Sequence, residues 1–153
     1  MSLHFCRGKN IHHNQLPMPY STFSTEIIIR PDDIDMNQHL HSTRYLDYVL
    51  TARFDQMGRC YGMSMEEFIK LGYSWVNTKT YVEYKREMKL GDTAVVFTHL
   101  DQLQERGCIV QFEIRSKATN KVCCNGWCEF VMVSIETGRS VIIPDFIIEK
   151  YSV

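Results

Sequence analysis

Acidic, amide and imidazole side chains are concentrated between residues 30 and 45, which is the segment of the sequence best equipped for chemistry. It contains the run Asp33-Ile34-Asp35-Met36-Asn37-Gln38-His39-Leu40 and stands directly before a segment with helical periodicity. An acid or a histidine can activate water or attack directly. A helix N-terminus offers free backbone N–H groups and a positive dipole end that stabilise an oxyanion. These residue types indicate either a hydrolytic site or a loop that caps the helix.

A long helix is predicted from Thr43 to about Tyr61, with Ser42 or Thr43 as its N-cap. The apolar residues of this segment are three or four positions apart, which is typical of an amphipathic helix. They are Leu46, Val49, Leu50, Phe54 and Met57. A short second helix is predicted from Met65 to Leu71, closed by Gly72.

The remaining segments read as strands, because apolar and polar residues alternate within them. One strand precedes the acidic segment and four follow the helices in a predicted meander. The strands are Phe23–Arg30, Val76–Lys85, Thr93–Leu100, Cys108–Arg115 and Val122–Ile135. One helix against a five-stranded antiparallel sheet gives an α+β fold. Because a single helix covers one face and leaves an edge open, we expect a homodimer or homotetramer.

The bulk composition fits a single soluble domain. The chain has 153 residues and a net charge of −1, which argues against a general nucleic-acid binder. No apolar run is long enough to cross a membrane, and no signal-peptide core is found near the N-terminus, so a cytoplasmic protein is expected. Residues 1–20 read as a flexible extension, and residues 21–153 as one domain.

Neither the six cysteines nor the N-terminal histidines predict a metal site or a cofactor. Without an export signal the thiols should be reduced. Cys123, Cys124 and Cys128 fall within one predicted strand, where neighbouring side chains point to opposite faces, and they read as packing residues. The spacing of His4, Cys6, His12 and His13 matches no defensible zinc pattern.

The acidic segment also carries a family resemblance. The stretch Asp33–Leu40, followed by Tyr45-Leu46 and Ala52-Arg53, resembles the signature of hotdog-fold thioesterases of the 4-hydroxybenzoyl-CoA thioesterase-like group. The run from Asp35 to His39 is also similar to plant acyl-ACP thioesterases, and Val82–Glu87 is similar to their Leu-Glu-Tyr-Arg-Arg-Glu segment. The resemblance covers about residues 22 to 150. It implies a hotdog domain, in which a five-stranded antiparallel sheet wraps around one long helix.

The resemblance further implies an acyl-CoA or acyl-ACP thioester hydrolase of fatty acid metabolism. Asp35 matches the catalytic acid, as nucleophile or general base. Asn37 and His39 match residues that orient water or the thioester, and Glu87 matches a further acid. A second group of positions is expected to bind substrate or hold the oxyanion: Ser42, Thr43, Tyr45, Gly72 and Ser74. Two alternatives remain open, a non-catalytic acyl-thioester-binding hotdog protein and a hotdog hydratase or dehydratase.

Other residues of the segment are assigned to structure. Asp33 is expected to cap the helix or to pair with Arg30 or Arg44, Arg53 to be buried and paired, and Tyr45 to pack against the loop. The sequence departs from the bacterial pattern at Gln38, where glycine is usual, and again at His41-Ser42. Cations that could meet a phosphate lie near two turns, although a solvated charged turn is the simpler reading. They are Lys85, Arg86 and Lys89 at one turn, and Arg115, Lys117 and Lys121 at the other.

Overall fold

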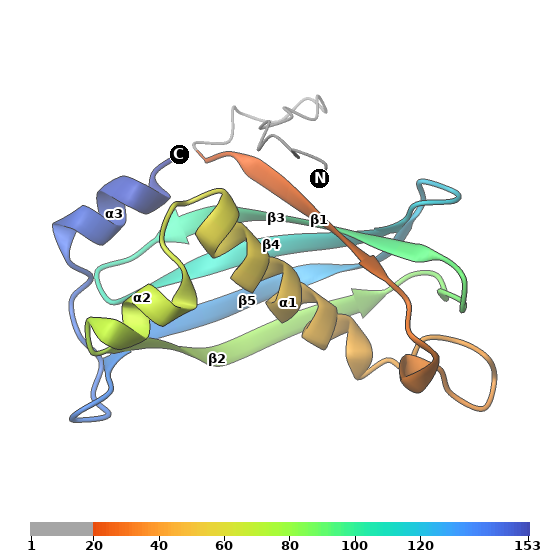
Figure 1. Cartoon of the computed structure of the whole chain (residues 1–153), viewed down its shortest axis with the longest axis horizontal. Coiled ribbons are helices and arrows are strands. Elements are labelled where there is room, and N and C mark those ends of the chain that lie inside the picture. The colour runs from red at the N-terminus through yellow and green to blue at the C-terminus, as the bar shows by residue number, and fades with distance from the viewer. Residues whose placement is uncertain (1–19) are drawn as a thin grey trace.

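The computed structural model describes residues 20–153, in which five strands and three α-helices follow one another along the chain (Figure 1). The strands are β1 (Thr22–Ile28), β2 (Tyr73–Tyr84), β3 (Thr93–Leu103), β4 (Gly107–Ser116) and β5 (Val122–Ser134). The helices are α1 (Arg44–Arg59), α2 (Met65–Lys70) and α3 (Asp145–Tyr151), with a short 3-10 turn η1 (Pro31–Asp33) before α1. The predicted strand–helix–strand order is confirmed. The predicted extension over residues 1–20 lies almost wholly outside the described residues.

All five strands form one antiparallel sheet in the order β1-β3-β4-β5-β2. The chain from β3 to β5 is a meander, as predicted. The prediction that β2 also belongs to the meander is wrong, because β2 pairs with β5. β3 already has β1 on one side and β4 on the other, so it offers no free edge to β2. As a result β1 and β2 are the two edges of the sheet.

The main core forms where α1 crosses one face of the sheet (Figure 1). The helix buries Tyr45, Tyr48, Val49 and Ala52, each at most 4% exposed. Alternate residues of the strands meet this stripe, among them the fully buried Ala94, Val96 and Ile114. Period-3.6 burial on the helix and period-2 burial on the strands therefore coincide, as the sequence pattern requires. This confirms the α+β class, with a long helix against a five-stranded sheet.

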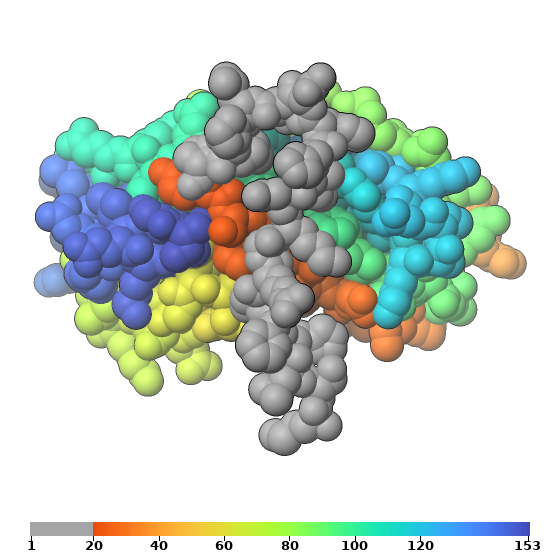
Figure 2. All heavy atoms as spheres, turned by 90° about the horizontal axis from the view of Figure 1, so that it is seen from above, coloured from red at the N-terminus to blue at the C-terminus, as the bar shows by residue number. Residues whose placement is uncertain are grey.

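The C-terminal segment closes the far end of the molecule and was not predicted to be helical. Pro144 precedes α3, whose Ile147 and Tyr151 are buried in a second core cluster beside Phe68. The Tyr151 hydroxyl donates to the carbonyl of Met63 at 3.1 Å. Figure 2 shows the blue C-terminal segment against the start of β1 and the yellow residues that follow α1.

Cys123 and Cys124 correct a prediction about the strand β5. Neighbouring strand residues normally face opposite sides, yet both thiols are buried, at 2% and 0% exposure. The register explains this, because Ile114 pairs with Cys124 and Arg115 with Val122, so that Cys123 is an extra, bulged residue. The bulge places both small side chains in the core. No disulfide forms among the five cysteines of the described chain.

A substitution at Gly126 tests how closely the backbones of β2 and β5 approach each other. A Cβ at this position would lie 1.9 Å from the carbonyl oxygen of Tyr81, which is backbone and cannot move aside. We expect Gly126→Ala to lower the free energy of unfolding by about 1–3 kcal/mol, the usual cost of overpacking. Urea denaturation followed by circular dichroism measures this. Gly58→Ala is the matched control, because its Cβ would make an ordinary contact of 3.7 Å and alanine favours the helix. That variant should be as stable as the wild type or slightly more so.

Candidate active site

The acidic segment folds into a tight loop between η1 and α1. The Asp35 N–H donates to the carbonyl of His39 at 2.8 Å, and the Gln38 N–H donates to the carbonyl of Asp35 at 3.0 Å. Gln38 has a φ of 63°, the left-handed region that favours glycine. This explains why glycine is usual at this position in the pattern that the sequence resembles. Hydrogen bonds within its own backbone therefore close the loop.

Asp35 occupies the centre of the loop with one oxygen engaged and one free. Its Oδ1 accepts from the backbone N–H of Asn37 at 2.9 Å and of His39 at 3.1 Å. Its Oδ2 has no hydrogen-bond donor among residues 20–153. The half-buried carboxylate is thus fixed through one oxygen, while the other can accept a proton from water or attack a carbonyl carbon.

His39 and Glu87 are brought together, although they are far apart in the sequence. The Nε2 atom of His39 lies 2.8 Å from the Oε2 atom of Glu87. The contact forms because the loop is joined to the segment after β2, where the Leu40 N–H donates to the carbonyl of Met88 at 2.8 Å. With Nε2 directed at a carboxylate, Nδ1 is left as an acceptor in the neutral imidazole. The pair can orient a water molecule or move a proton.

Asp33 anchors the loop and plays the structural part expected of it. Its side chain is 3% exposed and meets both predicted arginines, with Oδ2 at 3.1 Å from Arg30 Nε and Oδ1 at 3.4 Å from Arg44 Nε. Tyr48 of α1 donates its hydroxyl to Oδ2 at 2.8 Å. Burial alone would raise the pKa of Asp33, but hydrogen bonds from Tyr48 and Arg30 outweigh it and hold the pKa below its ordinary value.

The start of α1 differs from the predicted cap. Thr43 is the N-cap residue, but its side chain makes no capping hydrogen bond, and Ser42 contributes its backbone carbonyl, which accepts from the Tyr84 hydroxyl at 2.8 Å. Both residues are exposed. Backbone N–H groups in the first turn of a helix lack intrahelical acceptors, so the oxyanion role assigned to this turn stays a prediction.

Tyr45, expected to contact substrate or to pack, is 4% exposed and belongs to the main core. Its ring stands edge-on to Tyr84, with centroids 5.4 Å apart. Burial is the main reason why the pKa of Tyr45 rises to about 12. Tyr84 and Tyr48, which brace the loop, were not singled out by the sequence. Tyr48 lies on the buried stripe of α1, a position that could have indicated it.

Three predicted site residues stand apart from this cluster. Asn37 is exposed, and its side-chain amide makes no hydrogen bond with a described residue. Gly72 and Ser74 lie at the start of β2, whereas Glu87 follows its end, roughly 35 Å away at 3.3 Å per strand residue. The Gly72 N–H already donates to the carbonyl of Ile69 at 2.9 Å, so it is not a free oxyanion donor within this chain.

Several cations lie in the segment that joins β2 to the loop of the site. Lys85, Arg86 and Lys89 are exposed and belong to the same segment as Glu87. Lys85 pairs with Glu83 at 3.2 Å, and Arg86 donates to the carbonyl of Val122 at 3.0 Å. At the other predicted turn, Arg115 pairs with Glu113, and Lys117 pairs with Glu26 at 2.9 Å. Only the first group is joined to the site through its backbone.

A cavity of about 200 Å³ lies under the C-terminal half of α1, between β2 and α3. Its walls include Trp75, Leu100, Ile143 and Tyr151, and Arg53 is among its lining residues. Within residues 20–153 no group of three His, Cys, Asp or Glu side chains is placed to hold a metal ion. The potential metal ligands considered near the N-terminus lie outside this range. No helix of the described chain is long and apolar enough to cross a membrane.

A long helix laid across a five-stranded antiparallel sheet defines a hotdog-type domain, which here carries an acidic loop at the helix N-terminus. Residues 29–151 match the family model of the Thioesterase-like superfamily, and the chain belongs to that superfamily. The predicted fold family and the predicted enzyme class, a thioester hydrolase, are thereby confirmed.

Individual relatives are distant in sequence and close in fold. The chain is 23% identical over 126 residues to the long-chain acyl-CoA thioesterase FadM of Escherichia coli, covering 82% of this chain and 94% of that protein. A DHNA-CoA thioesterase from Staphylococcus aureus superposes with a TM-score of 0.78 at 23% identity, over 87% of this chain and 89% of that one. The S. aureus protein SAV2348, solved in complex with CoA, superposes with a TM-score of 0.77 at 17% identity, over 89% and 85%.

Asp33 gives a pH-dependent prediction. Because the folded pKa lies below the ordinary value of 3.8, the ionised carboxylate stabilises the fold fully above about pH 4. This stabilisation is lost as the pH falls through the folded pKa. We expect Asp33→Asn to lower the free energy of unfolding at pH 7 by about 2 kcal/mol, because its charge-assisted hydrogen bonds are weakened. Urea titrations from neutral pH to below pH 3 should show the difference shrinking in acid. The exposed neighbour Asp32, changed to Asn, should match the wild type throughout.

Proposed function

We propose that the protein hydrolyses the thioester of an acyl-CoA, with Asp35 as the catalytic acid. The observation that carries this is the geometry of Asp35, whose Oδ1 is fixed by two backbone N–H groups while Oδ2 is free. Oδ2 takes a proton from the attacking water, or attacks the carbonyl carbon itself to form an anhydride that water then opens. In both routes the acyl group leaves as a carboxylic acid and coenzyme A leaves as a thiol.

The neighbouring residues have supporting roles in this proposal. His39, oriented by Glu87 at 2.8 Å, positions the water or the thioester carbonyl, together with Asn37. Charge that develops on the carbonyl oxygen is stabilised by the backbone N–H groups in the first turn of α1, near Ser42 and Thr43. Lys85, Arg86 and Lys89 supply positive charge for the phosphates of CoA. An acyl carrier protein presents a phosphopantetheine thioester with the same chemistry and is the alternative carrier.

The site is completed by a second copy of the chain, joined along β2. β2 is an edge strand of 12 residues, and most of its side chains are exposed. Antiparallel pairing of two β2 strands about a twofold axis places the start of one strand beside the end of the other. Gly72 and Ser74 of one protomer are then near the Glu87 region of its partner, where they can line the thioester pocket despite their separation in one chain. A tetramer would pair two such dimers, and the proposed location is the cytoplasm.

Asp35→Asn tests the chemistry with little change to the loop. The asparagine side chain keeps an oxygen for the N–H groups of Asn37 and His39, but it is neither a base nor a nucleophile. We expect the rate constant kcat to fall at least 100-fold, as is typical for loss of a general base, with Tm within a few degrees of the wild type. Hydrolysis of acyl-CoAs is followed by the release of thiol. Asp32→Asn, on the exposed side of η1, is the matched control and should keep full activity. An unchanged rate in Asp35→Asn would exclude Asp35 as the catalytic group.

Thr78→Pro tests the proposed dimer. Thr78 is the bulged residue of β2, since the register with β5 shifts between Asn77 and Lys79, so a proline there leaves the ladder to β5 largely intact. A proline there also interrupts the edge along which a second β2 would pair. We expect the wild type to have twice the chain mass of 18.0 kDa by light scattering. Thr78→Pro should shift toward the monomer and lose activity in parallel, whereas Thr78→Val should not. A fully active monomeric wild type would refute the shared site.

A further inference from the structure

Arg53 is a buried cation beside an apolar cavity. The residue is 7% exposed, and it lines the cavity of about 200 Å³ under α1. Most of the other lining side chains are apolar, among them Met57, Leu100 and Ile147. A dry apolar cavity of roughly 150 Å³ holds a benzene ring. This cavity therefore has room for a ring or a chain of about six carbons. Phe54, which also lines the cavity, is 52% exposed.

No carboxylate neutralises Arg53. Its Nη1 atom donates to Thr98 Oγ1 at 3.2 Å and to the Tyr61 hydroxyl at 3.5 Å, and its guanidinium lies 5.2 Å from the centre of the Tyr61 ring. These partners are all uncharged. No acid among residues 20–153 forms an ion pair with it, and residues 1–19 contain neither Asp nor Glu. The prediction that Arg53 is buried and paired is confirmed, but its partners are a threonine and a tyrosine and not an acid.

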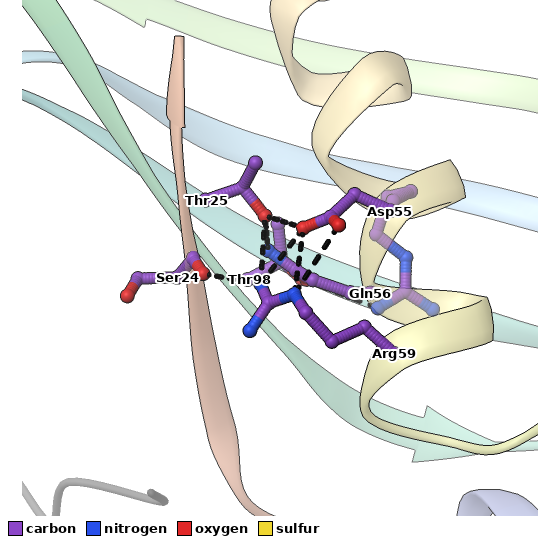
Figure 3. Close-up of polar contacts among 7 residues, drawn as sticks. Ser24, Thr25, Asp55, Gln56, Arg59 and Thr98 are labelled. Carbon is purple, nitrogen blue, oxygen red and sulfur yellow. Dashed lines mark hydrogen bonds and ion pairs between the residues drawn. The ribbon is translucent and has the colours of Figure 1, made fainter. Parts of the chain in front are cut away.

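The nearest acid on α1 is committed elsewhere, as Figure 3 shows. Asp55 pairs with Arg59 at 2.7 Å and accepts from the Thr25 hydroxyl at 2.6 Å. Gln56 connects this surface cluster to the interior, because it donates to Thr25 at 3.1 Å and accepts from the Thr98 hydroxyl. The network thus holds Thr98, and through it Arg53, in a defined place without supplying a negative charge.

An uncompensated guanidinium in such surroundings is costly, and the cost is offset when an anion binds. The apolar walls strengthen its attraction to an anion relative to water. Carboxylates match the guanidinium especially well, because they accept two parallel N–H bonds. Nε and Nη2 of Arg53 make no hydrogen bond with a described residue and are available for this purpose.

The anion bound here is not the thioester carbonyl that reacts at the loop. Arg53 lies nine residues beyond Arg44, the first residue of α1, which is about 13 Å along the helix axis. A group at Arg53 is therefore remote from that carbonyl within one protomer. In the proposed dimer the start of β2, which carries the lining residues Trp75 and Asn77, lies beside the loop of the partner, so an acyl chain can enter the cavity from there and reach Arg53 with its distal end. The cavity extends from Arg53 toward the C-terminal end of α1, and its apolar walls suit a hydrocarbon chain.

We propose that the cavity binds an acyl chain whose distal end carries a carboxylate, and that Arg53 is the residue that selects it. This rests on the proposed thioester hydrolysis and names its substrate class, the ω-carboxyacyl thioesters. Asn77, which also lines the cavity, is a second polar group near its open side.

The first test compares matched thioesters. The wild type is assayed with pairs of acyl-CoAs of equal length, from four to about twelve carbons, that end in a methyl group or in a carboxylate. We expect kcat/KM to favour the carboxylate member at least tenfold at the best length, mainly through KM. Arg53→Met should abolish or reverse the preference while keeping turnover of the methyl-terminated substrate, and Arg53→Lys should keep part of it. Arg139→Met, at an exposed turn away from the cavity, should behave as the wild type.

A second test needs no catalysis. Binding of hexanoate and of hexanamide, which have equal length and differ in charge, is measured by calorimetry on the wild-type protein. We expect hexanoate to bind at least tenfold more tightly, and Arg53→Met to remove the difference. Equal binding of the two ligands would overturn the inference, whatever the hydrolysis assays show. Hydrolysis of methyl-terminated and carboxylate-terminated thioesters at equal efficiency would also overturn it, yet leave the proposed function intact. Failure to hydrolyse any thioester would instead contradict the proposed function.

Discussion

A single buried carboxylate, that of Asp33, holds together the parts on which the site depends. Its oxygens meet Arg30 at the end of the first strand region and both Arg44 and Tyr48 on α1, while its backbone carbonyl accepts from the His41 N–H at 2.9 Å. The strand, the helix and both ends of the loop are thereby fixed to one point. Because this carboxylate is buried and fully bonded, it can position the loop but cannot take part in chemistry at its surface.

The two acids Asp33 and Asp35 show how environment divides labour between identical side chains. Two residues apart, one is buried under α1 and satisfied by a tyrosine and two arginines, and the other keeps a free oxygen at the mouth of the loop. The same contrast separates the arginines of α1. Arg59 has the carboxylate of Asp55, whereas Arg53 is buried without one, and a buried charge without a counter-charge is costly to stability.

Much of the fold was predictable, because the helix and the strands each follow from the local spacing of apolar residues. The apolar steps of three and four residues place α1 within about two residues of its ends, and alternation locates all five strands. The site residues Asp35, His39 and Glu87 were indicated by resemblance, since residue types and spacing alone also fit a capping loop. Their catalytic roles remain predictions, although the structure does bring His39 and Glu87 together. The sequence did not predict the position of β2 in the sheet, the bulge at Cys123 or the helix α3. Strand register and packing involve residues that are distant in the sequence.

The sequence by itself therefore determined the elements, the loop and the family, because each depends on neighbouring residues or on a contiguous motif. Only the tertiary structure decided which strand pairs with which, that Glu87 meets His39, and that Arg53 has no acid beside it. The physical reason is that charge compensation and strand pairing depend on residues that are close in space but far apart in the sequence. A guanidinium that looks ordinary on a helical pattern becomes a potential binding group only when every carboxylate in the fold proves to lie elsewhere.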